Sequence, residues 1–234
     1  MATKRRFGVS TRLHQRSRLS RDHLLEIAAH GFELVEVLAL RTHFDFANPA
    51  VVADLQQWLA EARLELHGLH VSAALAEADD ALFVARRIPM AVLTVQVGRP
   101  REAAKTVERL AELAAPLGVA LAIDSNSEGL TPIGSLVHYV EGFDAKIGVS
   151  LDCASVKRPG DLADAIETAS EHLVSMHAPV ESRIDWRSAL TTVQKVGYEG
   201  AVIVDPPPRA SSREMLRLAR DARERFEKQL CTFT

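Results

Sequence analysis

The sequence has little cysteine, no long apolar run and no strong excess of either charge. Its 234 residues include two cysteines, Cys153 and Cys231, too few for a disulfide framework, so we expect a reducing cytoplasm. No apolar stretch approaches the roughly 18 residues that span a bilayer. The basic start MATKRRFGVSTR is not followed by the apolar segment of a secretory signal. A net charge of −3 argues against broad nucleic-acid binding, so we expect neither a membrane nor a nucleic-acid partner.

What the sequence does contain is a short apolar run followed by a longer helical stretch, repeated along the chain. Runs rich in Val, Ile and Leu predict strands at residues 7–10, 34–37, 66–70, 93–97, 119–124, 147–152, 173–177 and 201–205. Helical periodicity predicts helices at residues 21–29, 49–63, 79–87, 101–117, 133–143, 161–169, 185–196 and 212–229. No linker or change in composition interrupts this pattern. The sequence therefore predicts one domain over residues 1–234.

A closed (β/α)₈ barrel explains this pattern better than an open doubly wound sheet does. In the strand 147–152, Gly148, Ser150 and Asp152 share one parity, whereas the other parity is bulky and apolar. A barrel interior accepts small side chains, but an open parallel sheet carries bulky apolar residues on both faces. With about 29 residues per unit the predicted barrel is small for its class. Only a short helix fits between His70 and Leu93.

The predicted strands end in polar residues, where the active sites of such barrels lie. The last inward positions are Ser10, Glu36, His70, Gln96, Asp124, Asp152, His177 and Asp205. A single Asp after a strand is usually a cap or turn residue, but here four successive strands end in groups that can bind a metal. Three carboxylates around one axis repel each other unless a cation or proton compensates them. Three Asp and one His suit Mn²⁺, Mg²⁺ or Co²⁺, with Zn²⁺ as a further option.

The chain resembles the xylose isomerase-like barrel superfamily, which contains sugar and sugar-phosphate isomerases and epimerases, relatives of D-tagatose 3-epimerase, inosose dehydratases and the endonuclease IV group. The similar segments are FGVSTRLH, GFELVEVLA, LHGLHVS, VALAIDSNS, IGVSLDCAS, LVSMHAPVESRIDW and GYEGAVIVD. The resemblance implies one divalent cation held by Asp124, Asp152, His177 and Asp205. Asp152 and His177 match the family in identity, whereas Asp124 and Asp205 replace glutamates. It also implies a substrate contact by Arg183, six residues after His177.

Other positions depart from the family pattern. Ser155 replaces the histidine that follows the sixth strand, Ser175 replaces the first histidine of the seventh, and Gln96 replaces that of the fourth. Without these histidines the three-zinc cluster of the endonuclease IV group cannot form, which argues against nucleic-acid repair and leaves at most one metal site. Each Glu-to-Asp replacement also shortens the reach of the carboxylate by roughly 1.5 Å.

The leading hypothesis is a sugar or sugar-phosphate isomerase or epimerase. The resemblance implies that a cation binds adjacent sugar oxygens while a carboxylate removes the α proton, which gives an enediolate. Asp124 and Asp205 are the expected acid/base residues, and we expect Glu36, His70 and Gln96 to bind substrate. For Glu36 and His70 the alternative is a hydrogen-bonded structural layer below the site. Two alternatives stay open: a metal-poor barrel that binds a small anionic carbohydrate or a partner without turnover, and a polyol dehydratase or lyase. A homo-oligomer is compatible with each.

Basic residues follow most of the predicted strands, on the loops that open toward the expected site. They are Arg12, Arg16, Arg18, Arg41, Arg99, Arg101, Lys157, Arg158, Arg183 and Arg209. Such a rim would attract an anionic ligand such as a sugar phosphate or a sugar acid. The alternative is that these long side chains only solvate the loops.

Overall fold

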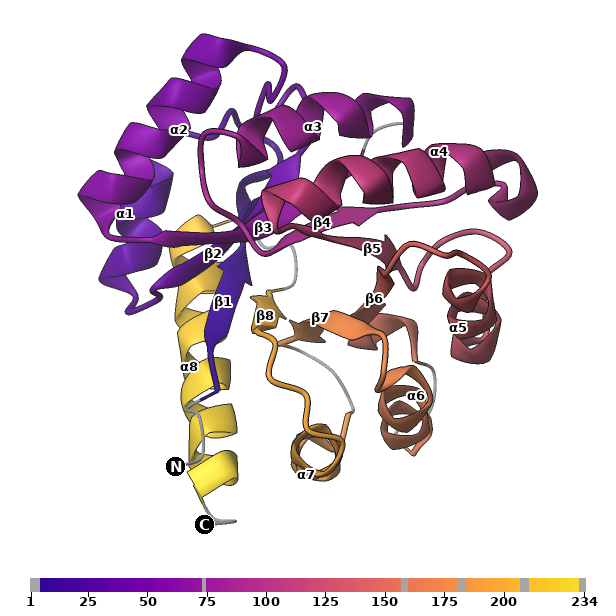
Figure 1. Cartoon of the computed structure of the whole chain (residues 1–234). Helices are drawn as coiled ribbons and strands as arrows, with labels where there is room; N and C mark the ends of the chain where they lie inside the picture. The colour runs from indigo at the N-terminus through magenta and orange to yellow at the C-terminus, as the bar shows by residue number, and fades with distance from the viewer. Residues whose placement is uncertain (1–4, 73–74, 157–159, 181–183, 207–210, 232–234) are drawn as a thin grey trace.

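The protein forms a closed barrel of parallel strands surrounded by helices (Figure 1). The structure is a computed structural model and describes residues 5–72, 75–156, 160–180, 184–206 and 211–231. The eight strands follow one another in chain order, and the last pairs with the first, Phe7 lying opposite Val202. This arrangement confirms the predicted (β/α)₈ barrel and excludes an open sheet.

The elements lie close to their predicted positions. The strands are β1 (Phe7–Ser10), β2 (Leu34–Ala39), β3 (Glu65–Val71), β4 (Val92–Val95), β5 (Ala120–Asp124), β6 (Ile147–Asp152), β7 (Leu173–Pro179) and β8 (Val202–Asp205). The α-helices are α1 (Arg21–Ala29), α2 (Pro49–Ala62), α3 (Ala78–Ala85), α4 (Pro100–Ala114), α5 (Ile133–Glu141), α6 (Asp161–Ala169), α7 (Trp186–Lys195) and α8 (Ser212–Cys231). Strand β4 ends two residues earlier than predicted, so Gln96 follows the strand instead of lying within it.

Helix α2 shows how local sequence sets the ends of an element. The side chain of Asn48 accepts a hydrogen bond from the Ala50 backbone N–H, and Pro49 begins the helix with its φ already suited to it. The chain leaves the helix at Arg63 with a left-handed φ of 54°. Val52, Leu55 and Leu59 form the buried stripe that packs on the barrel.

The barrel interior is narrow, as the small residues on one strand parity predict. A Cβ atom on Gly68 of β3 would lie 2.2 Å from the Val92 carbonyl oxygen of β4, so these two strands require glycine at this point. Gly68 therefore fixes the close pairing of β3 with β4, two residues before His70.

The connection between β3 and α3 is short, as the sequence predicts. A 3-10 helix, Leu75–Glu77, leads directly into α3. None of the helices in the described ranges combines the length and apolar character that a bilayer span demands.

Candidate functional site

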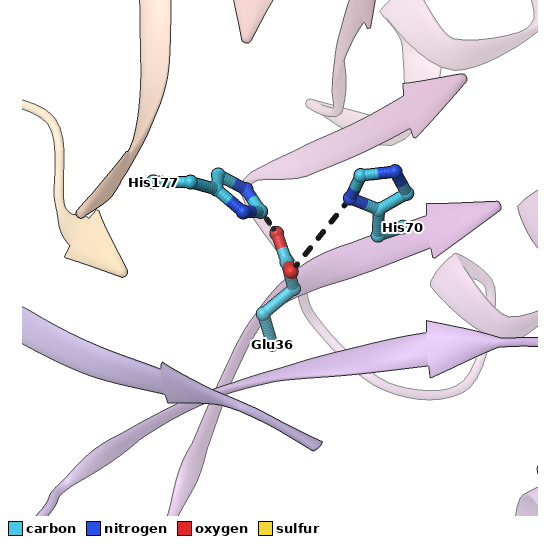
Figure 2. A group of neighbouring side chains, drawn as sticks. All are labelled: Glu36, His70 and His177. Carbon is cyan, nitrogen blue, oxygen red and sulfur yellow. Dashed lines mark ion pairs between the residues drawn. The ribbon is translucent and has the colours of Figure 1, made fainter. Parts of the chain in front are cut away.

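Three buried residues from three strands meet at the mouth of the barrel. Glu36 lies on β2, His70 on β3 and His177 on β7, each no more than 3% exposed. Their potential ligand atoms all lie within 4.8 Å of one another. Glu36 lies between the two imidazoles: its Oε2 is 3.0 Å from His177 Nε2, and its Oε1 is 3.9 Å from His70 Nδ1 (Figure 2).

The Glu36 and His177 side chains form a buried ion pair. Burial is the largest effect and opposes the charged form of Glu36, but the imidazoles of His177, His70 and His67 together outweigh it and lower the pKa of Glu36 to about 2. Burial likewise opposes protonation of His177, yet the Glu36 carboxylate raises the pKa of His177 to about 9. His177 Nε2 and Glu36 Oε1 have no hydrogen bond of good geometry to any described residue. The pair is therefore held mainly by charge.

A second set of contacts connects both expected acid/base residues through a histidine and an arginine. Asp124 Oδ2 lies 3.0 Å from His70 Nε2, and Arg12 places Nη2 3.3 Å from His70 Nδ1 and Nη1 3.0 Å from Asp205 Oδ2. A guanidinium only donates hydrogen bonds, so His70 Nδ1 must accept. The ring proton of neutral His70 is then on Nε2 and is donated to Asp124. The order of the contacts is Asp124, His70, Arg12, Asp205.

The two carboxyl groups at the ends of this chain differ in pKa and exposure. Burial acts to raise the pKa of Asp124, but the hydrogen bond from His70 and that from the Asn126 backbone lower it to about 2. Burial raises the pKa of Asp205, and Arg12 only partly reverses this effect. The Asp124 side chain is 3% exposed, whereas that of Asp205 is 18% exposed. Paired carboxyl groups with opposite shifts are typical of acid/base sites.

Asp152 has the local role of a cap residue. Its Oδ1 accepts a hydrogen bond from the Ala154 backbone N–H at 2.8 Å, at the start of the 3-10 helix Cys153–Ser155. Its Oδ2 accepts from Asn126 Nδ2 at 2.8 Å, and the Asn126 backbone N–H is 2.7 Å from Asp124 Oδ1. Asn126 therefore bridges two expected ligands. The sequence analysis missed it, although the Asp-Ser-Asn order after β5 is a signal for a local turn.

The four expected metal ligands do not form a cluster of their own among the described residues. Asp124 binds His70, Asp152 caps a helix, Asp205 pairs with Arg12, and His177 pairs with Glu36. Arg12, from the loop after β1, supplies the partner of Asp205 and also contacts His70, the partner of Asp124.

The cluster Glu36, His70 and His177 has suitable donor types for Zn²⁺, Mn²⁺ or Fe²⁺. In this structure, however, Arg12 donates to His70 Nδ1 and the charge of Glu36 is balanced by His177. A cation here would stand beside the guanidinium and would require a neutral His177. The arrangement as it stands does not fit a divalent cation.

The remaining expected site residues have mixed positions. Gln96 is exposed and donates from Nε2 to Asp124 Oδ2 at 3.3 Å, so it covers Asp124 from the mouth. Arg183 lies outside the described residues, as do three residues of the expected basic rim: Lys157, Arg158 and Arg209.

Parts of the basic rim are neutralised by neighbouring acids. Arg41 pairs with Glu77, Asp80 and Asp45, and Arg99 lies 3.4 Å from Glu102. These two arginines therefore have acidic partners, which is neither the free basic rim nor the purely solvating role that the sequence analysis considered.

Known proteins share the fold of this chain at low sequence identity. No protein-family model matches the chain, and no curated protein matches it. Among solved structures, D-psicose 3-epimerase with D-tagatose from Clostridium cellulolyticum H10 is 16% identical, with a TM-score of 0.77 over 96% of this chain and 99% of that one. A xylose isomerase-like TIM barrel protein from Mycobacterium smegmatis, in complex with magnesium, is 12% identical, with a TM-score of 0.78 over 98% and 97%.

A third similar structure is the probable 3-DHS dehydratase AsbF from Bacillus anthracis, 12% identical, with a TM-score of 0.71 over 94% of this chain and 98% of that one. At these identities the likeness establishes the fold alone. The expected resemblance to xylose isomerase-like barrels is confirmed at that level, and sugar epimerases and isomerases are prominent among the similar structures.

Proposed function

We propose that the protein binds a small carbohydrate at the barrel mouth and isomerises or epimerises it by proton transfer. The observation that carries this proposal is the run of contacts Asp124, His70, Arg12, Asp205, which places a carboxyl group at each end of a charged network. The fold shared with sugar epimerases supports the same class of reaction.

The two carboxyl groups take different roles in the proposal. Asp205 is partly exposed at the end of the contact run, so in the proposal it is the group that returns a proton to the substrate carbon. Burial raises the pKa of Asp205, and Arg12 opposes this effect. Asp124 stays ionised and accepts a proton once the substrate displaces the 3.3 Å contact of Gln96. A base must come within roughly 2.6–3.2 Å of the proton it removes, and substrate binding has to achieve that approach.

The proposed substrate is a sugar phosphate or a sugar acid. Arg16 and Arg18, in the loop after β1, are exposed and have no ion-pair partner among the described residues. Their charges are free to attract an anionic group, whereas Gln96 and Asp152 offer hydrogen bonds to hydroxyl groups.

Hydrogen–deuterium exchange tests this proposal. The protein is incubated in D₂O with aldoses, ketoses, their phosphates and sugar acids, and ¹H NMR follows the proton on the carbon next to the carbonyl. We expect loss of this signal and formation of an isomer.

Asp205→Asn should slow exchange by about 10²-fold or more, since a positioned acid or base contributes that much. Asp79→Asn on the exposed surface is the control. Failure of every tested sugar to exchange would refute the proposal.

A binding protein without turnover is the second candidate. The 3% exposure of the Asp124 side chain and the ion pairing of Asp205 favour it, because both groups already have partners. Calorimetric binding of a sugar that shows no exchange would support this candidate over the enzyme. A dehydratase would instead give an unsaturated product in the same NMR spectra.

A further inference from the structure

The position of Arg12 is fixed by contacts of the loop that carries it. Arg12 lies in the 3-10 helix Thr11–His14, and its backbone N–H donates to Ser10 Oγ at 3.3 Å. The neighbouring Thr11 is fully buried, and its Oγ1 accepts from the Leu38 backbone N–H at 3.0 Å and lies 3.1 Å from His43 Nε2. These contacts of Thr11 therefore hold the backbone next to Arg12 against β2 and against the loop that follows β2.

The Arg12 guanidinium is the cationic centre of an acidic site. Burial acts to lower the pKa of Arg12, but Asp205, Glu36, Asp152 and Asp124 together raise it above its usual value. The side chain nevertheless remains 30% exposed. A permanent positive charge thus faces both the carboxylates and the solvent of the mouth.

Part of the hydrogen-bonding capacity of Arg12 is unused. A guanidinium has five N–H donors, and two of them are directed at Asp205 and His70. The other three have no partner among the described residues. These donors lie beside Asp205, next to the place where substrate oxygens would bind in the proposed reaction.

We propose that Arg12 is a catalytic residue of this barrel and that its guanidinium performs the charge stabilisation that the sequence analysis expected of a bound cation. The inference rests on the proposed function and deepens it: the substrate is a hydroxycarbonyl sugar whose carbonyl oxygen receives a hydrogen bond from Arg12. A guanidinium fork matches two adjacent oxygens, so it suits the two oxygens of an enediolate.

The reaction balances without a metal or a redox partner. Asp124 takes the proton from the carbon next to the carbonyl, and the C–H electron pair forms the carbon–carbon double bond. The carbonyl π pair moves onto oxygen, where Arg12 stabilises the negative charge. Asp205 then returns a proton to carbon, and the two carboxyl groups recover their protonation states by exchange with water.

Substitution of Arg12 combined with a metal titration tests this inference. For exchange activity, Arg12→Gln should lower the rate by about 10²-fold or more, and Arg12→Lys should retain part of it because it keeps the charge but loses the fork. Treatment with EDTA should leave the wild-type rate unchanged. The matched control is Arg109→Gln, which removes another paired arginine, 2.8 Å from Asp79 on the outer helices.

The second readout, Mn²⁺ affinity, needs no turnover. Calorimetry should show weak Mn²⁺ binding to the wild type and to Arg109→Gln, and at least about tenfold tighter binding to Arg12→Gln, because its carboxylates lose their fixed counter-charge. Wild-type exchange that requires Mn²⁺, or an Arg12→Gln variant that binds Mn²⁺ no better than the wild type, would overturn the inference.

Different results would refute the proposed reaction and the proposed role of Arg12. If no sugar exchanges deuterium, the proposed reaction is wrong, while the Mn²⁺ comparison still decides whether Arg12 takes the place of a cation. Circular dichroism and the melting temperatures of Arg12→Gln and Arg12→Lys show whether a loss of function in Arg12→Gln reflects unfolding.

Discussion

Glu36 Oε2 lies 3.0 Å from His177 Nε2, which joins β2 to β7 inside the barrel mouth. Both side chains are nearly inaccessible to solvent, so neither charge is compensated by water. Each group is therefore the closest charged partner of the other, and loss of one charge leaves the second buried without that partner.

Removing the carboxylate should destabilise the protein. For Glu36→Gln we expect the free energy of unfolding to fall by about 3–5 kcal/mol, the usual cost of leaving a buried charge without its partner. Urea denaturation monitored by circular dichroism measures it. Glu167→Gln, which breaks the exposed pair with Lys195, is the control and should leave the urea midpoint nearly unchanged. Equal midpoint shifts in both variants would contradict a special role for the buried pair.

The same pair should make stability depend on alkaline pH. The pKa of His177 is about 9 in the folded protein and about 6.5 in an unfolded chain. The folded state therefore binds the extra proton between these values, so the stabilisation is complete below pH 6.5 and is lost as the pH rises through 9. Melting temperatures from pH 6 to 10 measure this decline, and Glu36→Gln should reduce it. An identical alkaline slope in both proteins would show that His177 is not the cause.

His14 should contribute to sensitivity at acid pH. Burial, with additional repulsion from His23 and His43, lowers the pKa of His14 to about 3. Between pH 6.5 and 3 the unfolded chain binds a proton that the folded state does not, so stability falls by about 1.4 kcal/mol per pH unit as the pH decreases. His14→Phe should make this decline shallower in urea melts. The exposed His138→Gln is the control, and an unchanged slope in His14→Phe would refute the assignment.

The close contact between β3 and β4 gives a prediction about folding. Gly68→Ala would place a methyl group 2.2 Å from the Val92 carbonyl oxygen, so the two strands must separate. We expect a loss of about 3 kcal/mol or more, at the upper end for overpacking, measured by urea denaturation. Gly98→Ala is the control because its methyl group would meet no atom within 4 Å. A Gly68→Ala protein as stable as this control would contradict the register of the two strands.

The sequence was sufficient to predict the barrel and the positions of the polar strand ends. Parity places Asp124 and His177 on the inner face whatever their partners, because successive side chains alternate across a strand. The partners could not be predicted in the same way. Asp152 is inward and acidic, yet it caps a helix through Ala154 and Asn126. The groups that Asp152 binds depend on local turn geometry, which the alternation of side chains along the strand does not determine.

The partner of Asp205 could not be predicted from the sequence either. Its partner Arg12 is 193 positions away and belongs to a loop that the sequence analysis placed at the mouth without naming a partner. The direction of the Arg12 side chain depends on how Thr11 and His43 fix the loop, through a contact between residues 32 positions apart.

The separation of Arg12 and Asp205 also has a consequence for synthesis. Arg12 follows the first strand of the barrel and Asp205 ends the last strand, which pairs with β1 to close the barrel. A growing chain therefore carries the arginine long before its carboxylate partner exists. The mouth acquires its balance of charge only when translation of β8 is complete, so truncated chains that end before Val202 contain seven strands of the barrel and lack the pair of Arg12 with Asp205.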